Sequence, residues 1–255
     1  VGNFADAAIF STDHSKPLNT LIGGLLYTRD NRLYEKIKSF SKSLPDLEKI
    51  HQKNLYNRIL FERVNYVPRS YPRARLKAYA RDVLKKIKGE RLATFLENDY
   101  AKYPVTPPLY PYPAKMPAFL ARLGIFEIER WKFERIKRKD MLQKYIAISE
   151  KSKLVKYLPR VYFDSKVDIV PLRFAFCHPD AKMMIKRMAD FIDVDWFWFK
   201  HPIVCASGSL ESFGYKMNSC PLSERSGASI INWPCLVPEG WHFKTLELFE
   251  KIISG

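Results

Sequence analysis

Residues 1–28, VGNFADAAIFSTDHSKPLNTLIGGLLYT, decide how the chain is interpreted. Two apolar runs, residues 4–11 and 23–28, are suited to buried core strands, and a polar loop separates them. Lys16 is the single lysine of this stretch and lies within the loop. An amine held at the rim of an apolar core is partly desolvated, which makes it nucleophilic near neutral pH. The stretch therefore indicates a strand–loop–strand unit with a lysine in a place that Schiff-base chemistry requires.

The residues around Lys16 are compatible with a phosphorylated, planar cofactor. Ser11 ends the first apolar run and can donate its hydroxyl to a phosphate, while Gly23 and Gly24 let the backbone approach a ring closely. Pro17 restricts Lys16 to an extended backbone, which fixes the direction of its side chain. A solvated loop lysine is the commoner explanation of such spacing, so spacing alone does not assign the chemistry.

The same stretch resembles the signature of the DegT/DnrJ-type sugar aminotransferases, which use pyridoxal 5′-phosphate (PLP) and have fold type I. In that family a run like G-x-F-x-D-x-A-x-F-S precedes the PLP lysine, and a G-G pair before an apolar strand follows it. Residues 2–11, Lys16 and residues 23–24 match this order. The resemblance implies that Lys16 forms the Schiff base with PLP and moves the proton during the reaction, and that Ser11 binds the PLP phosphate. His14 is a further candidate contact for cofactor or substrate, with an ordinary loop histidine as the alternative.

A looser similarity to the family continues downstream. Residues 115–124 resemble the helix that follows an Arg-Met pair in the family. The landmarks of its small domain are similar in order and spacing to residues 201–203, 220–224 and 231–234. On this ground His201 is a candidate substrate-binding residue.

We predict an α/β chain of fold type I, with an incomplete large domain followed by a small C-terminal α/β domain. The expected parts are the C-terminal portion of the large PLP-binding domain, a basic helical insertion with a Pro-rich connector, a long interdomain helix and the small domain, at residues 1–44, 45–110, 111–160 and 161–255. The chain begins without methionine or a signal peptide, so we expect further sequence before Val1 that carries the remaining cofactor contacts. On that expectation this fragment alone is inactive.

The spacing of apolar residues predicts the individual elements. Helices are expected at residues 32–42, 47–65, 73–88, 118–149, 179–192, 223–229 and 243–253, and further strands at 167–176, 194–199 and 230–234. In the longest helix, Phe133 and Ile136 are expected on the apolar stripe, and the charged run at residues 134–140 is expected to supply the face toward water.

Basic residues outnumber acidic residues by 43 to 27, which gives a formal net charge of +16. The excess is concentrated in residues 29–91 and 115–160. Solvated helix faces explain most such runs, and a surface that binds nucleic acid, touches an anionic membrane or steers a phosphorylated substrate is the alternative. No nucleic-acid-binding motif accompanies the lysines, so no nucleic acid is expected, whereas peripheral contact with a membrane stays open.

The composition excludes several classes of protein. A content of 47% hydrophobic and 14% aromatic residues is too apolar for a disordered chain, and no run approaches the roughly 18 apolar residues of a membrane span. Four cysteines without a CxxC pair do not indicate a disulfide scaffold, so a reducing, cytoplasmic location is expected. The cysteines and His201 match no ligand spacing, so no metal site is predicted.

Together these observations predict an enzyme, a PLP-dependent aminotransferase. It would move an amino group from an amino acid such as glutamate to a nucleotide-linked keto-sugar. The product would be used in the synthesis of cell-surface polysaccharide or of secondary-metabolite sugars, and the enzyme is expected to be a homodimer. Two alternatives stay open: a PLP-dependent sugar dehydratase of the same family, and a non-catalytic basic module that binds nucleic acid or an anionic membrane.

Overall fold

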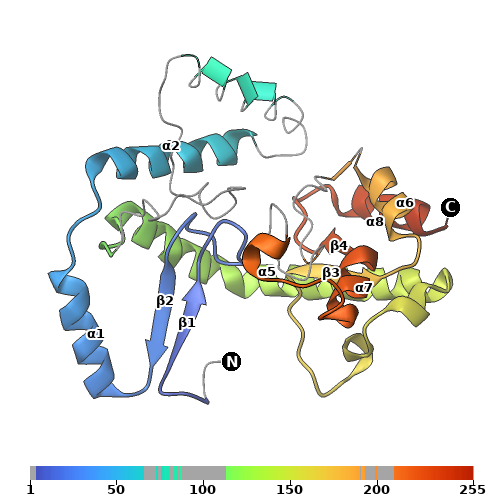
Figure 1. The fold of residues 1–255 in the computed structure, drawn as a ribbon, viewed down its shortest axis with the longest axis horizontal. Coiled ribbons are helices and arrows are strands. Elements are labelled where there is room, and N and C mark those ends of the chain that lie inside the picture. The colour runs from blue at the N-terminus through green and yellow to red at the C-terminus, as the bar shows by residue number, and fades with distance from the viewer. Residues whose placement is uncertain are drawn as a thin grey trace. The chain divides into compact units, whose positions relative to one another are not determined.

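The computed structural model describes residues 4–65, 113–189 and 210–254, together with isolated residues between these ranges. The chain forms two compact units, residues 1–131 and 132–255. Figure 1 labels the strands and α-helices. In chain order the elements are β1 (Ala7–Ser11), β2 (Gly24–Thr28), α1 (Asn31–Ser43), α2 (Lys49–Asn65), α5 (Ala118–Lys151), the short 3-10 helices η1 (Leu154–Tyr157) and η2 (Arg160–Phe163), β3 (Arg173–Cys177), α6 (Ala181–Met188), the 3-10 helix η3 (Leu210–Phe213), α7 (Pro221–Ser229), β4 (Ile230–Pro234) and α8 (His242–Ser254). The fold is mixed α/β, as predicted.

Most predicted elements are present close to their expected bounds. The strand expected at residues 194–199, apart from Phe199, and the Pro-rich connector lie outside the described residues. So does half of the helix expected at residues 73–88, and the described residues of that range are helical. The strand expected at residues 167–176 is shorter than predicted, because it begins only at Arg173. The division between the two units falls between residues 131 and 132, which lie within helix α5.

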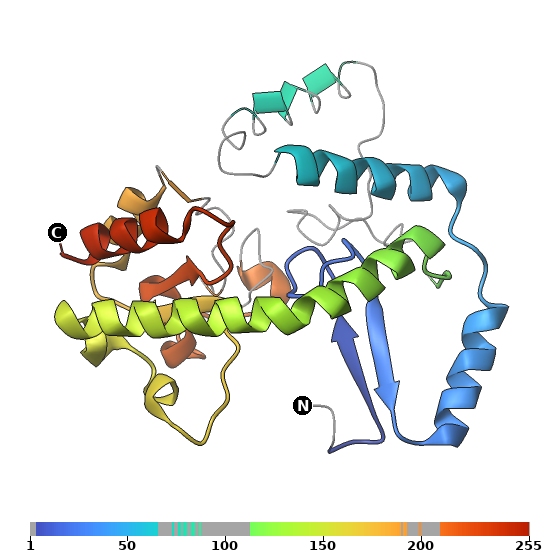
Figure 2. The same cartoon turned by 180° about the vertical axis from the view of Figure 1, so that it is seen from behind.

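Strands β1 and β2 form a two-stranded antiparallel sheet, drawn as the blue arrows of Figure 2. In its register Ser11 lies opposite Gly24. The prediction that these strands are buried is wrong for the described part of the chain. Ile9 on β1 is 81% exposed and Leu26 on β2 is 45% exposed. The reason is that no third strand pairs with this hairpin among the described residues, so its apolar side chains are not covered.

Helix α1 begins directly after the hairpin because Asp30 caps it. The Asp30 carboxylate accepts hydrogen bonds from the backbone N–H groups of Arg32 at 2.7 Å and Leu33 at 3.2 Å. These two donors have no partner inside the helix, so the cap stabilises the first turn.

A small core in the first unit anchors the loop that follows β1. Its buried members come from that loop, from the region of α2 and from the first turn of α5: Leu21, Ile22, Leu47, Leu55 and Leu120. The second half of the loop between β1 and β2 is therefore held in place by apolar packing, although the strands themselves are exposed.

An ion-pair cluster around Glu127 contributes to the contact between α2 and α5. Glu127 on α5 is 3% exposed, and its carboxylate lies 2.9 Å from Arg130 on the same helix and 3.9 Å from Arg63 on α2. A buried carboxylate needs such partners, because an unpaired buried charge strongly destabilises a fold.

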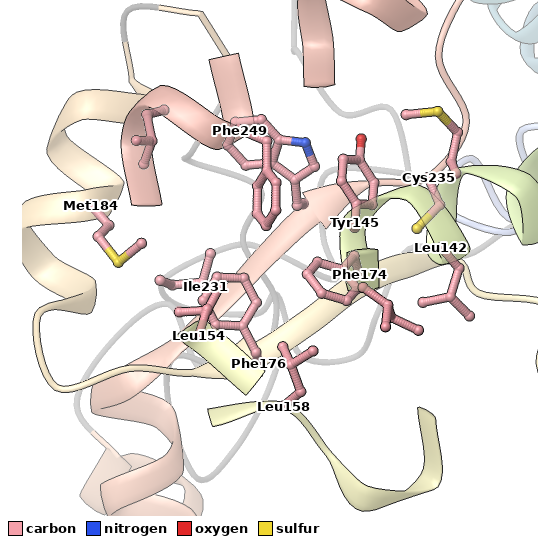
Figure 3. Close-up of a cluster of buried hydrophobic side chains, with 14 of the residues drawn as sticks. Leu142, Tyr145, Leu154, Leu158, Phe174, Phe176, Met184, Ile231, Cys235 and Phe249 are labelled. Carbon is pink, nitrogen blue, oxygen red and sulfur yellow. The ribbon is translucent and has the colours of Figure 1, made fainter. Parts of the chain in front are cut away.

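The second unit is built on the antiparallel hairpin of β3 and β4. Figure 3 shows the aromatic cluster that packs on it, in which the Tyr145 ring lies 4.9 Å from that of Phe249 and 5.3 Å from that of Phe174. The hydroxyl of Tyr145 donates to the Pro234 carbonyl at 2.9 Å, so the ring is buried and its polar end is satisfied.

The prediction for the faces of α5 is wrong in the second unit. Phe133 is 69% exposed and Ile136 is 61% exposed, whereas Glu134 and Arg138 are buried at 6% and 4%. The buried face continues through Tyr145. The reason is a set of hydrogen bonds made by Arg138, which the spacing of apolar residues does not predict.

The guanidinium of Arg138 donates to the carbonyls of Pro171 at 3.3 Å and Leu172 at 3.1 Å, and Glu134 lies 3.8 Å from it. These carbonyls immediately precede β3, and Pro171 has no N–H to offer a neighbouring strand. Arg138 thus binds the segment before the strand, which is consistent with β3 beginning at Arg173.

The hydroxyl of Tyr162 binds the outer edge of β3. It lies 2.9 Å from the backbone nitrogen of Ala175 and 3.0 Å from the carbonyl oxygen of the same residue, so it accepts one hydrogen bond and donates the other. Burial raises the pKa of Tyr162, and the hydrogen bond that the Ala175 N–H donates to its oxygen opposes that shift without cancelling it. The hydroxyl therefore stays protonated and can donate at neutral pH.

We predict that Tyr162→Phe lowers the free energy of unfolding by about 1–3 kcal/mol, because both backbone groups of Ala175 lose a partner. Urea unfolding followed by circular dichroism measures the change. Tyr157→Phe is the matched control, since Tyr157 contributes an edge contact with the ring of His178 that phenylalanine preserves. Equal midpoints for the two variants would contradict the prediction.

Candidate functional site

The loop between β1 and β2 carries Lys16, and two buried threonines close its base. The Thr12 N–H donates to the Gly23 carbonyl at 3.0 Å, and the Thr20 N–H donates to the Thr12 carbonyl at 2.9 Å. A hydrogen bond of 2.6 Å joins the hydroxyls of Thr12 and Thr20, which are 2% and 1% exposed. The buried polar groups at the base of the loop therefore form hydrogen bonds with one another.

A second set of hydrogen bonds crosses the loop above this base. The His14 N–H donates to the Leu21 carbonyl at 3.2 Å. Asn19 bridges the same residues, because its amide nitrogen donates to the His14 carbonyl at 3.2 Å and its amide oxygen accepts from the Leu21 N–H at 2.8 Å. Leu21 has a φ of 72°, a left-handed conformation that these bonds and its burial hold in place.

Asp13 organises the turn at the tip of the loop. Its carboxylate accepts from the His14 N–H at 2.7 Å, pairs with the ring nitrogen Nδ1 of His14 at 2.7 Å and accepts from the Ser15 hydroxyl at 3.2 Å. Its backbone carbonyl accepts from the Lys16 N–H at 2.8 Å. The turn of residues 13–16 therefore presents Lys16 on a fixed backbone, and Pro17 restricts that backbone further.

The pKa of Asp13 is lowered from its ordinary value of 3.8. Partial burial acts to raise the pKa, but the hydrogen bond and the charge interaction with His14, together with the other hydrogen bonds from His14 and Ser15, outweigh it. The carboxylate is therefore ionised at neutral pH, which is the state that accepts all of these bonds.

Gly23 is needed where the loop returns to β2. Its φ is 109°, a conformation that side-chain-bearing residues rarely adopt. A Cβ there would lie 2.3 Å from the Cε of Met116, although that methyl is the end of a flexible side chain and can move aside. The backbone conformation, more than the contact, excludes other residues.

The three predicted residues Ser11, His14 and Lys16 all lie at or within this loop. Ser11 ends β1 and is exposed, and its oxygen accepts from the Asp13 N–H at 3.4 Å, which leaves its own O–H able to donate to another group. His14 and Lys16 are half-buried. His201 lies outside the described residues.

The residue types of the loop fit a phosphorylated aldehyde cofactor. They offer a primary amine that can condense with an aldehyde and, on Ser11 and His14, a hydroxyl and an imidazole that can bind a phosphate. Thr12, Asp13, Asn19 and Thr20 were not predicted from the sequence as residues of the site. The signal available for them is that Asp, Asn and Thr in a loop hydrogen-bond their own backbone.

The cysteines and the rest of the chain offer no competing centre in the part that the structure describes. No group of three metal-binding side chains occurs there, and no described helix is long and apolar enough to cross a membrane. Burial raises the pKa of the Cys235 thiol to about 12, so this cysteine is protonated and unreactive at neutral pH.

We predict that Gly23→Ala destabilises the chain by about 1–2 kcal/mol through its backbone conformation. Gly240→Ala is the matched control for backbone strain, since Gly240 also has a positive φ of 82° but open space around it. Both variants should unfold at similarly reduced urea midpoints. If Gly23→Ala/Met116→Ala regains full stability, the contact with Met116 sets the requirement and the prediction is wrong.

We predict that the Asp13 carboxyl carbon titrates by NMR with a midpoint below 3.8, the ordinary value. Because the folded-state pKa is lowered, the stability that Asp13 contributes is present above pH 4 or so and is lost as the pH falls through the folded-state pKa. His14→Ala should move the midpoint upward. An unchanged midpoint in that variant would show that His14 is not the partner that holds the carboxylate ionised.

Comparisons with known proteins place the fold. No family model matches the chain, and no curated protein matches its sequence. Among solved structures it is similar to a Streptococcus pneumoniae protein described as a sugar aminotransferase, Spr1654, in its PMP form, at 14% identity and a TM-score of 0.55. The match covers 99% of this chain and 54% of that one, so the chain spans about half the length of this neighbour. The chain thus has a fold like that of one half of the neighbour.

Proposed function

We propose that the chain is part of a PLP-dependent aminotransferase of fold type I that acts on a keto-sugar, with Lys16 as the residue that holds the cofactor. The observation that carries the proposal is the position of Lys16, half-buried on a polar loop that hydrogen bonds close at its base. The similar fold of a protein described as a sugar aminotransferase in its PMP form supports it.

The loop residues have distinct tasks in this proposal. PLP, when bound, supplies an electron sink that stabilises negative charge developing on the substrate. The Nζ of Lys16 holds the cofactor and takes and returns the proton, because a primary amine serves as nucleophile and as base. The hydroxyl of Ser11 donates to the phosphate, and the imidazole of His14 contacts cofactor or substrate.

The substrates and partners belong to the proposal as well. The keto-sugar is nucleotide-linked and the amino donor is an amino acid such as glutamate, within a cytoplasmic homodimer. The net charge of +16 supports an anionic substrate, since excess positive charge raises the rate at which anions arrive. The neighbour is about twice as long as this chain, which supports further cofactor contacts from polypeptide beyond these residues.

Reductive labelling tests the role of Lys16. The protein made from its complete coding sequence is incubated with PLP and reduced with borohydride, and the modified lysines are identified by peptide mapping. We predict that Lys16 is labelled at a PLP concentration on the order of tenfold lower than other lysines require, because a positioned amine reacts ahead of randomly placed ones. Lys38→Ala is the control, since Lys38 lies on α1 and contacts Glu35 and the Tyr34 ring.

Two outcomes would contradict the proposal. If the label is spread evenly over surface lysines and is unchanged in Lys16→Ala, Lys16 does not hold the cofactor. Strongly salt-dependent retention of the protein on polyanion columns would then favour the alternative of a non-catalytic basic module. If Lys16 is labelled but a keto-sugar and glutamate give a deoxy-sugar product and no amino-sugar, the chain belongs with the dehydratases.

A further inference from the structure

We propose that Asp13 is the positioning residue for Lys16, and that it acts by fixing the turn on which the lysine is carried. This inference rests on the proposed function of Lys16. Four hydrogen-bonding contacts end on Asp13, and all of them come from the three residues that follow it: two from His14, one from Ser15 and one from the Lys16 N–H.

The backbone carbonyl and the side-chain carboxylate of Asp13 bind different residues of the turn. Its carbonyl accepts the Lys16 N–H at 2.8 Å, which closes the turn of residues 13–16. Its carboxylate binds His14 and Ser15, the two central residues of that turn, and so removes the alternative backbone conformations that a four-residue turn would otherwise sample. The side chain of Lys16 leaves the backbone at the end of this turn, so its direction follows from the contacts of Asp13.

The carboxylate also fixes the state of the His14 ring. A carboxylate only accepts hydrogen bonds, so Nδ1 of His14, at 2.7 Å from it, carries a proton. In the neutral imidazole the other nitrogen, Nε2, is then the acceptor. Asp13 thereby sets which nitrogen of His14 can accept and which can donate, in addition to the direction of Lys16.

The base of the loop does not depend on Asp13. The hydroxyl pair of Thr12 and Thr20 and the packing of Leu21 hold the loop ends without using the Asp13 carboxylate. Removing that carboxylate is therefore expected to loosen the tip of the loop and to leave the fold in place. This separation makes positioning distinguishable from general stabilisation.

The test compares Asp13→Ala, Asp13→Asn and Asp30→Ala in the protein made from its complete coding sequence. Asp30 is the matched control, because its carboxylate likewise accepts hydrogen bonds from following backbone N–H groups, those of Arg32 at 2.7 Å and Leu33 at 3.2 Å, but caps α1. The rate of labelling of Lys16 by PLP and borohydride should fall about tenfold in Asp13→Ala. It should fall less in Asp13→Asn, whose amide oxygen still accepts, and should stay unchanged in Asp30→Ala.

A spectroscopic measurement accompanies the labelling. In ¹⁵N spectra of the side chain at neutral pH, the neutral form of His14 should be protonated on Nδ1 in the wild type. It should lose that preference in Asp13→Ala and show it more weakly in Asp13→Asn, because a neutral amide oxygen is a weaker acceptor than a carboxylate. This readout needs no cofactor, and Asp13→Asn provides it even where Asp13→Ala fails to fold.

The outcomes separate the inference from the proposed function. Absence of preferential labelling in the wild type overturns the proposed function and this inference with it. Preferential labelling that is equally fast in Asp13→Ala overturns the inference alone, and so does an equal slowing in Asp13→Ala and Asp30→Ala. A His14 tautomer unaffected by Asp13→Asn likewise contradicts the pairing on which the inference is built.

Discussion

The hydrogen bond between the buried hydroxyls of Thr12 and Thr20 is the contact on which the candidate site depends. It joins the two ends of the loop where β1 stops, and the Thr20 hydroxyl also lies 2.7 Å from the Ile22 carbonyl, so both buried hydroxyls have partners. Just beyond it, Leu21 and Ile22 enter the core of the first unit. The loop therefore has an apolar anchor and a polar tip. Packing fixes where the loop stands, and the hydrogen bonds of Asp13 and Asn19 fix which way its tip faces, so the half-buried amine of Lys16 is oriented without being enclosed.

Much of this arrangement could be predicted from the sequence, and the exceptions share a cause. Strand–loop–strand order and the helix bounds follow from local periodicity, and the presence of Pro17 predicts a restricted backbone at Lys16. The pairing of Thr12 with Thr20 depends on which residues face each other across a closed loop, which spacing does not encode. Burial of β1 and β2 was expected from their composition, yet burial depends on what covers a strand. His201 and most of the aromatic run before it lie outside the described residues, so the substrate-binding role of His201 and the strand at residues 194–199 remain predictions.

Helix α5 shows the same limit of periodicity in another form. A stripe of aromatic residues predicts an apolar face, but the buried face of its second half contains Glu134 and Arg138. Arg138 is buried because its guanidinium donates hydrogen bonds to the carbonyls of Pro171 and Leu172. In the first unit Glu127 is buried with Arg130 and Arg63 beside it. Several charges of this basic chain therefore hold segments together, and only the remainder forms a surface field that can attract an anion.

The hydroxyl of Tyr162 has a consequence for association between chains. An exposed strand edge is a template onto which another polypeptide can add, and aggregation commonly starts there. At the centre of β3 both groups that such an addition would use, the N–H and the carbonyl of Ala175, already bind a single side-chain oxygen. This edge of the second unit is therefore closed to strand addition at its midpoint by one phenol. A short hairpin can in this way keep an outer edge without offering it to a foreign strand.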